Sequence, residues 1–235
     1  MKERPILFND EMVRAILDGR KTQTRRVVNF AKLSDIRSGR LFYSDTFKSW
    51  AIEENAPNKV HRLDLVKCPY GEVGDRLWVR ECWAELMHTS PSSDKPELCE
   101  GDKLVEHATR NDDGRWNYDG TVIAYRATSN IVFCDGDGFR TEKSLWRPSI
   151  QKKRERSRIT LEISHIRVER LQDISEADAY LEGVSLYESN FHHYDCADPY
   201  RYHFSMLWDS INSGDRSWLA NPWVWVIEFK RIEPI

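Results

Sequence analysis

The residues best suited to chemistry lie in one short run, Gly-Arg-Lys-Thr-Gln-Thr-Arg-Arg, which spans residues 19–26. Four cations fall within seven positions, and Thr22 and Thr24 place hydroxyl groups among them. Positive charge and hydroxyl groups held together suit an anionic or nucleotide-like ligand. The alternative is a solvated basic strand on an ordinary surface, and the spacing alone does not separate the two interpretations.

The elements around this run decide whether its side chains can share a site. Residues 10–18 carry apolar side chains at helical spacing, and Gly19 stands where a left-handed residue would end that helix. Residues 20–28 then read as a strand. Because neighbouring side chains of a strand alternate, Lys21 and Thr24 meet only if the backbone turns or bulges between them.

A second notable position is Glu182, far along the chain. Ser175 and Asp178 are typical of a helix start, and Gly183 predicts the end of that helix. Glu182 therefore lies at the negative end of the helix dipole. That position is unfavourable for a carboxylate unless a cation or a function compensates for it.

The remaining pattern predicts an α+β fold. Strands are expected at 5–8, 76–83, 121–127, 157–171 and 221–229, with a further helix at 198–212. The apolar phase of 157–171 changes near His165, which predicts a β-bulge there. The final strand is apolar on both faces and should be central. We expect one domain over 1–235, a small mixed β-barrel with flanking helices and loop insertions at about 29–66 and 87–145.

Composition indicates the cellular compartment and the kinds of ligand to expect. The chain has 235 residues and a net charge of -3, yet residues 151–170 hold seven Lys or Arg against three Asp or Glu. Five cysteines form no CxxC pair, and neither a signal peptide nor a long apolar run is present, which predicts a reducing cytoplasm and no membrane segment. His192, His193, Cys196 and His203 fit no metal template, so we expect no metal and no cofactor.

Three motifs resemble the ASCH superfamily, whose compact β-barrels are related to the PUA fold. They are the Gly-x-Lys-Thr run at 19–25, Gly-Asp-x-Leu-x-Val at 74–79, and the terminal strand at 225–230. A fuller set is similar to long ASCH-like proteins of bacteriophages and prophages: Cys-Pro-Tyr-Gly at 68–71, Trp-Arg-Pro-Ser-Ile at 146–150, and 168–174. The segment after Pro-Ser-Ile, Gln-Lys-Lys-Arg-Glu-Arg at 151–156, departs from those relatives.

The resemblance implies a candidate site. One bacterial branch of the superfamily is similar to an amidohydrolase that deacetylates N(4)-acetylcytidine, and its catalytic residues correspond here to Lys21, Thr24 and Glu182. Thr24 would attack or orient water, Lys21 would act as a base if its pKa were lowered, and Glu182 would shuttle the proton or simply pair with Lys21. The further ligand contacts that we expect are Arg20, Thr22, Arg25, Arg26, Trp78, Arg80, Glu81, Lys152, Lys153 and Arg154.

Three functions remain open at this stage. The favoured one is recognition of RNA, a nucleoside or a modified base through the Lys/Thr/Arg pocket, in the cytoplasm of a bacterial host. The second is an enzyme, either an amidohydrolase of an acylated cytidine or a ribonuclease. The third is a phage accessory protein that binds a host protein. The sequence does not fix the oligomeric state.

Overall fold

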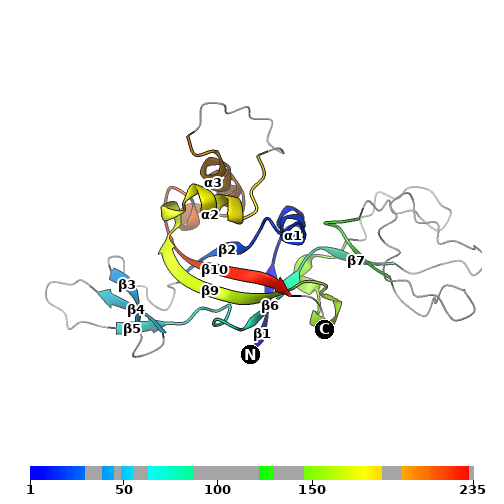
Figure 1. The fold of residues 1–235 in the computed structure, drawn as a ribbon, viewed down its shortest axis with the longest axis horizontal. Helices are drawn as coiled ribbons and strands as arrows, with labels where there is room; N and C mark the ends of the chain where they lie inside the picture. The colour runs from blue at the N-terminus through cyan, green and yellow to red at the C-terminus, as the bar shows by residue number, and fades with distance from the viewer. Residues whose placement is uncertain are drawn as a thin grey trace, which may run out of the picture.

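The computed structural model describes residues 1–29, 39–44, 49–54, 63–86, 122–129, 146–186 and 197–232. Its main sheet contains, in spatial order, β1 (Glu3–Leu7), β6 (Arg76–Arg80), β9 (Thr160–Arg170), β10 (Trp223–Ile232) and β2 (Gln23–Val27). β1 is parallel to β6, and all other neighbours are antiparallel. The fold is therefore α+β with a mixed sheet, as predicted (Figure 1).

The sheet is open rather than a closed barrel. β1 and β2 are its two edges, and no backbone ladder joins them within the described residues. A side chain links them instead: the Arg26 guanidinium of β2 donates to the Leu7 carbonyl of β1 at 2.6 Å. The same guanidinium lies 5.3 Å from the centre of the Phe8 ring. The predicted barrel closure is thus replaced by a contact between two edges.

Helix α1 (Asp10–Leu17) covers one face of the main sheet, the face that carries Trp225 and Ile227 of β10. The Asn9 side chain caps its start, and Gly19 follows its end with a φ of +76°, which confirms the predicted left-handed glycine. Val13 and Ile16 of α1 pack into a core with Trp225 and Ile227 of β10. The amphipathic pattern of 10–18 therefore placed this helix correctly.

Helices α2 (Glu176–Leu181) and α3 (Pro199–Ile211) cover the opposite face of β10. Their Ala179, Phe204 and Trp208 pack with Val224 and Val226 of that strand. β10 is consequently buried on both faces and paired on both sides, which confirms the central position predicted for it. Figure 1 shows α2 and α3 stacked beside the curved β9 and β10.

The predicted bulge is present in β9. His165 pairs with Glu228 and Ile163 pairs with Phe229, so Ser164 has no partner on β10. On one side of this bulge Leu161 and Ile163 face the core, and on the other side Ile166 and Val168 do. The bulge therefore absorbs the change of phase in the sequence.

The predicted insertions contain strands of their own. In the first, β3 (Gly39–Ser44), β4 (Ser49–Glu54) and β5 (Leu63–Val66) form an antiparallel sheet. The second contains β8 (Val122–Tyr125), which pairs with β7 (Trp83–Leu86) just before the insertion. Residues 87–121 and 130–145, which make up most of it, lie outside the described residues. Short 3₁₀ helices are η2 (Ser149–Gln151), η3 (Arg154–Arg156), η4 (Leu171–Asp173) and η5 (Gly214–Arg216).

Candidate functional site

Lys21 lies before the regular part of β2, in the junction between two helix ends. The Lys21 amide donates to the Ala15 carbonyl of α1 at 3.0 Å, and the Thr22 amide donates to the Leu181 carbonyl of α2 at 3.0 Å. Since β2 begins only at Gln23, strand alternation does not govern the direction of the Lys21 side chain. The backbone irregularity that the sequence required between Lys21 and Thr24 is therefore present.

Lys21 binds Glu182 at the end of α2. Its ammonium donates to the Glu182 main-chain carbonyl at 2.7 Å and to the Oε2 atom of the Glu182 carboxylate at 2.9 Å. Both side chains are buried. The cation thus offsets the unfavourable position of a carboxylate at a helix C-terminus and satisfies one of the free carbonyls there.

Gly183 makes this approach possible. Its φ is +86°, in the left-handed region that side chains disfavour. A Cβ atom on this residue would lie 2.8 Å from the Ala15 Cβ atom and 2.9 Å from the Lys21 Cβ atom. Only a glycine lets the end of α2 come this close to α1 and Lys21.

Arg25 holds the other side of the Glu182 carboxylate. Its Nη1 atom donates to Glu182 Oε1 at 2.9 Å, and the Arg25 side chain is completely buried. Arg25 also pairs with Glu169 and Asp178. Arg167 extends the cluster to the protein surface through Glu169, Asp178 and Glu228. Glu182 is therefore fixed at the inner end of an alternating network of charges.

Burial changes the proton affinity of this cluster. Removal from water lowers the pKa of Lys21, and the neighbouring Glu182 carboxylate opposes that change. Burial would raise the pKa of Asp178, but the hydrogen bond from Gln23 and the charges of Arg25 and Arg167 outweigh it and lower this pKa. Asp178 accordingly stays ionised and helps to hold Arg25.

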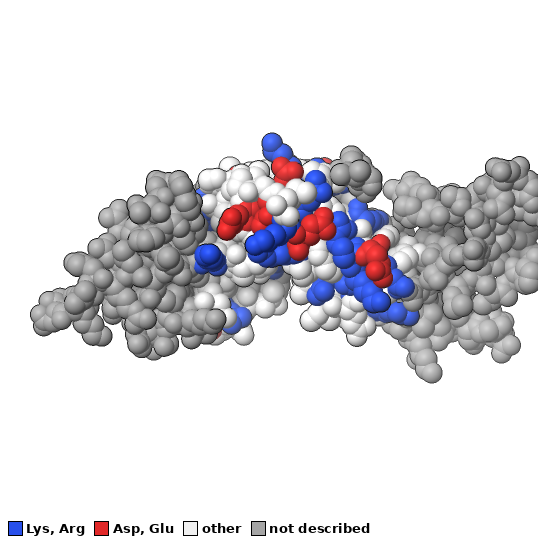
Figure 2. Space-filling model, turned by 90° about the horizontal axis from the view of Figure 1, so that it is seen from below, with Lys and Arg blue, Asp and Glu red and all other residues white. Residues whose placement is uncertain are grey.

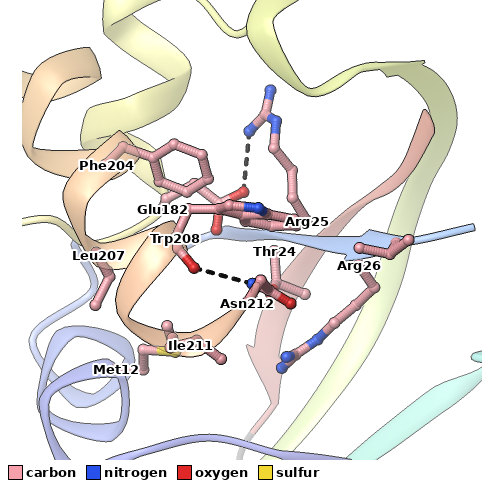
Figure 3. A pocket seen from close by; sticks show the side chains of 11 residues that line it. Met12, Thr24, Arg25, Arg26, Glu182, Phe204, Leu207, Trp208, Ile211 and Asn212 are labelled. Atoms are coloured by element: carbon pink, nitrogen blue, oxygen red, sulfur yellow. Dashed lines mark hydrogen bonds and ion pairs between the residues drawn. The ribbon is translucent and has the colours of Figure 1, made fainter. Parts of the chain in front are cut away.

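A hollow opens beside Glu182, between β2, α1 and α3 (Figure 3). The space that water-sized molecules can occupy in it is about 70 Å³, and the empty space totals about 450 Å³ when open solvent is counted, so the hollow is small and partly open. Its lining residues are Met12, Thr24, Arg25, Arg26, Val27, Glu182, Phe204, Leu207, Trp208, Ile211 and Asn212. One wall is apolar and comes mainly from α3, while β2 and the end of α2 supply the polar groups.

The polar groups of the hollow have unused bonding capacity. Among the described residues, the Thr24 hydroxyl makes no hydrogen bond, and the Arg26 Nε atom is buried without a partner. Burial lowers the pKa of Arg26 from its ordinary value. Asn212 donates from Nδ2 to the Trp208 carbonyl at 3.1 Å, which leaves its side-chain oxygen as an acceptor. A ligand here would meet donors and acceptors next to an apolar wall.

The structure brings together only part of the predicted site. Thr24, Arg25, Arg26 and Glu182 line the hollow, and Lys21 lies behind Glu182 rather than at the surface of the hollow. Arg20 and Thr22 lie outside it, at the junction of the helix ends, where Arg20 pairs with Asp18.

The other predicted contacts lie in a different region, along β6 and residues 152–158. Lys152 and Glu81 are fully buried and bind each other at 3.2 Å, and Arg158 binds the same carboxylate. Burial lowers the pKa of Lys152 to about 8. Trp78 is only 7% exposed. The Arg80 guanidinium lies 4.7 Å from its ring centre. Lys153 and Arg154 are exposed and pair with Glu155 and Glu3.

Sequence reasoning missed the wall that α3 contributes. Phe204, Leu207, Trp208 and Ile211 recur at helical spacing, a signal that predicts a packed face but not the element that it faces. The network members Glu169, Asp178 and Arg167 were also missed. Arg167 and Glu169 alternate along β9 and so share a face, and Asp178 lies on α2, but only the tertiary arrangement brings Arg25 to all three.

Comparison with protein-family models, curated proteins and solved structures found no match. In the described ranges, no His, Cys, Asp and Glu residues cluster in a way that could hold a metal ion. None of the helices in those ranges is both long and apolar enough to cross a bilayer. We therefore infer function from the geometry of the hollow.

Proposed function

We propose that this chain is an ASCH-like, PUA-related domain that binds a nucleoside or an unpaired RNA base in the hollow beside Glu182. The observation that carries the proposal is the composition of the hollow. An apolar wall with Phe204 and Trp208 faces a group of hydrogen-bonding side chains, Thr24, Arg26 and Glu182. A base has the matching shape, a flat apolar surface with donors and acceptors along its edge.

The charge network supports binding because it fixes the Glu182 carboxylate in advance. Each carboxylate oxygen accepts one N–H, from Lys21 or from Arg25, and keeps a free lone pair. An N–H group on a base could bind there without reorganising the site. Arg26, which has no carboxylate within ion-pair distance among the described residues, would receive a carbonyl or phosphate oxygen.

The test is binding of the four ribonucleosides and of a short single-stranded RNA, measured by calorimetry. Thr24→Val keeps the size of the side chain and removes the hydroxyl. Loss of one hydrogen bond of about 1 kcal/mol should weaken binding roughly fivefold. Thr128→Val, at an exposed turn, is the matched control and should bind like the wild type. No binding by the wild type, or unchanged affinity in Thr24→Val, would refute the proposal.

A second candidate is hydrolysis of an acyl group from a modified cytidine, favoured by the shared hollow of Thr24 and Glu182. Water would attack the amide carbonyl carbon and pass its proton to Glu182, and Glu182 would return it to the leaving amine. Arg26 would stabilise the oxyanion. Lys21, which is buried and donates two hydrogen bonds to Glu182, would act in this route as an anchor rather than as the base. Ribonuclease activity and host-protein binding stay predictions.

Acetate release from N(4)-acetylcytidine tests the hydrolase directly. Glu182→Gln preserves the shape of the side chain and removes its basicity, so release should fall at least about 100-fold. An enzyme that turns over at the wild-type rate in Glu182→Gln excludes this route. Binding without turnover in the wild type would leave recognition as the function.

A further inference from the structure

A second group of cations occupies the outer face of β6, away from the core. Leu77 and Val79 are fully buried, and Arg76, Trp78 and Arg80 alternate with them toward the other face. On the same face, Arg154 binds Glu3 of β1 and the Thr160 hydroxyl of β9. We call the group formed by Arg76, Arg80, Lys153 and Arg154 the outer basic face.

The Nε atoms of two arginines on this face lack acceptors. Both atoms, in Arg76 and Arg80, are buried and have no hydrogen-bond partner among the residues that the structure describes. Among the described residues, neither side chain forms an ion pair. A buried donor without an acceptor is unfavourable, and its presence calls for an unseen acceptor. Oxygen atoms of an anionic ligand would supply such acceptors to both arginines.

The neighbouring segment adds to the positive charge. Residues 146–158 contain six Lys or Arg and one Glu. Lys152 and Arg158 both bind the buried Glu81, which anchors this segment and keeps Lys153 and Arg154 at the surface. Figure 2 shows the molecule from below, where the Lys and Arg side chains to the right of centre form a band around a smaller acidic group.

The outer basic face and the hollow meet at the end of β1. Arg26 of the hollow donates to the Leu7 carbonyl. Leu7 is in turn the direct partner of Arg80 in the β1–β6 register. One residue of an edge strand therefore separates the two sites, and Leu7 itself is 42% exposed.

We propose that the outer basic face binds the phosphates of a single-stranded nucleic acid whose neighbouring nucleotide occupies the hollow. This inference rests on the function proposed above and makes its ligand a polynucleotide rather than a free nucleoside. Arginine forks suit phosphate oxygens, and Arg76 and Arg80, four residues apart in a strand, present repeated charge about 13 Å apart. Because Trp78 is almost buried, the face contacts backbone rather than bases.

The experiment compares a ten-nucleotide single-stranded RNA with free nucleosides over a range of salt concentrations. In the double variant Arg76→Gln and Arg80→Gln, the slope of log K against log salt should become shallower by roughly 1.4, because two phosphate contacts are lost. Nucleoside affinity should not change. Thr24→Val should weaken the binding of both ligands and leave the slope unchanged. The nucleoside affinity therefore tests the hollow, and the salt slope tests the outer basic face.

The double variant Arg14→Gln and Arg216→Gln removes the same charge from α1 and η5, and should keep the wild-type slope. The double variant Arg76→Lys and Arg80→Lys preserves the charge and should largely restore the wild-type slope. The inference would be overturned if the glutamine variant kept the wild-type slope, or if the lysine variant lost as much of the slope as the glutamine variant. It would also be overturned if the wild type bound polyglutamate as tightly as RNA. If the wild type binds no nucleoside but the salt slope of RNA binding still becomes shallower in the glutamine variant, the outer basic face binds phosphates and the proposed base site in the hollow is refuted.

Discussion

At the scale of single residues, the candidate site depends on charges that have been removed from water. Glu182 and Lys21 are both buried, and each would be costly to bury alone. Their pairing therefore stabilises the fold whether or not the hollow binds a ligand. Urea unfolding of Glu182→Gln must accompany its activity measurement, so that a loss of chemistry is distinguished from a loss of stability.

Removing the carboxylate should expose that dependence. Glu182→Ala leaves Lys21 and Arg25 facing one another without their shared anion, and should lower the free energy of unfolding by about 3–5 kcal/mol. Urea unfolding measures this, with Arg20→Ala as a surface control that should change it by less than about 1 kcal/mol. Adding Lys21→Met to Glu182→Ala should recover part of the loss. Additive losses in that double variant would contradict the coupling.

Lys152 gives the protein a pH dependence of its own. Burial lowers its pKa to about 8 from an ordinary value of 10.5, so above pH 8 the folded chain releases a proton that the unfolded chain still holds. Stability should therefore rise with pH relative to Lys152→Met, by about 2 kcal/mol between roughly pH 7 and pH 9.5. Parallel stability curves for the two proteins would show that Lys152 has an ordinary pKa.

At the scale of elements, two helix ends are built alike but are packed differently. Gly19 and Gly183 both follow a helix with positive φ, yet a Cβ atom on Gly19 would meet nothing within 4 Å. A Cβ atom on Gly183 would overlap Ala15 and Lys21. The two glycines therefore separate the cost of backbone strain from the cost of close packing.

Alanine substitutions at the two glycines should differ in a defined way. Gly19→Ala should cost about 1 kcal/mol, the price of a left-handed side chain. Gly183→Ala should cost a further 1–3 kcal/mol or so, because α2 must move away from Lys21. Thermal unfolding of both variants under one condition makes the comparison. Equal destabilisation of the two variants would mean that α2 can move away from α1 and Lys21 without a further loss of stability.

Local signals in the sequence predicted most of these elements. The Ser175 cap, the glycine stops at Gly19 and Gly183, the bulge near His165 and the buried strand β10 all follow from short-range patterns, and all are present. The predicted barrel is not, because closure depends on how far β1 and β2 approach, and no local pattern encodes that distance. For the same reason only part of the site was predicted: Thr24, Arg25, Arg26 and Glu182 were named, but not the α3 wall.

At the scale of the whole molecule, the open sheet should be unevenly protected. β9 and β10 are paired on both sides, while β1 and β2 each have one edge that no other described strand pairs with. Amide hydrogen exchange should therefore be slowest in the centre, with Val226 and Ile227 exchanging at least roughly tenfold more slowly than Ile6. Comparable protection of Ile6 would indicate that the gap between β1 and β2 is closed in solution.

The bulge at Ser164 changes the face of β9 on which the odd-numbered residues lie. Leu161, Ile163, Arg167 and Glu169 all occupy odd positions, so in an unbroken strand they would share one face. Because Ser164 is skipped in the pairing, the first two enter the core and the last two turn outward to Arg25 and Asp178. If Ser164 were instead paired in regular register, Arg167 and Val168 would exchange faces, and charged side chains would replace the apolar ones that β9 contributes to the core.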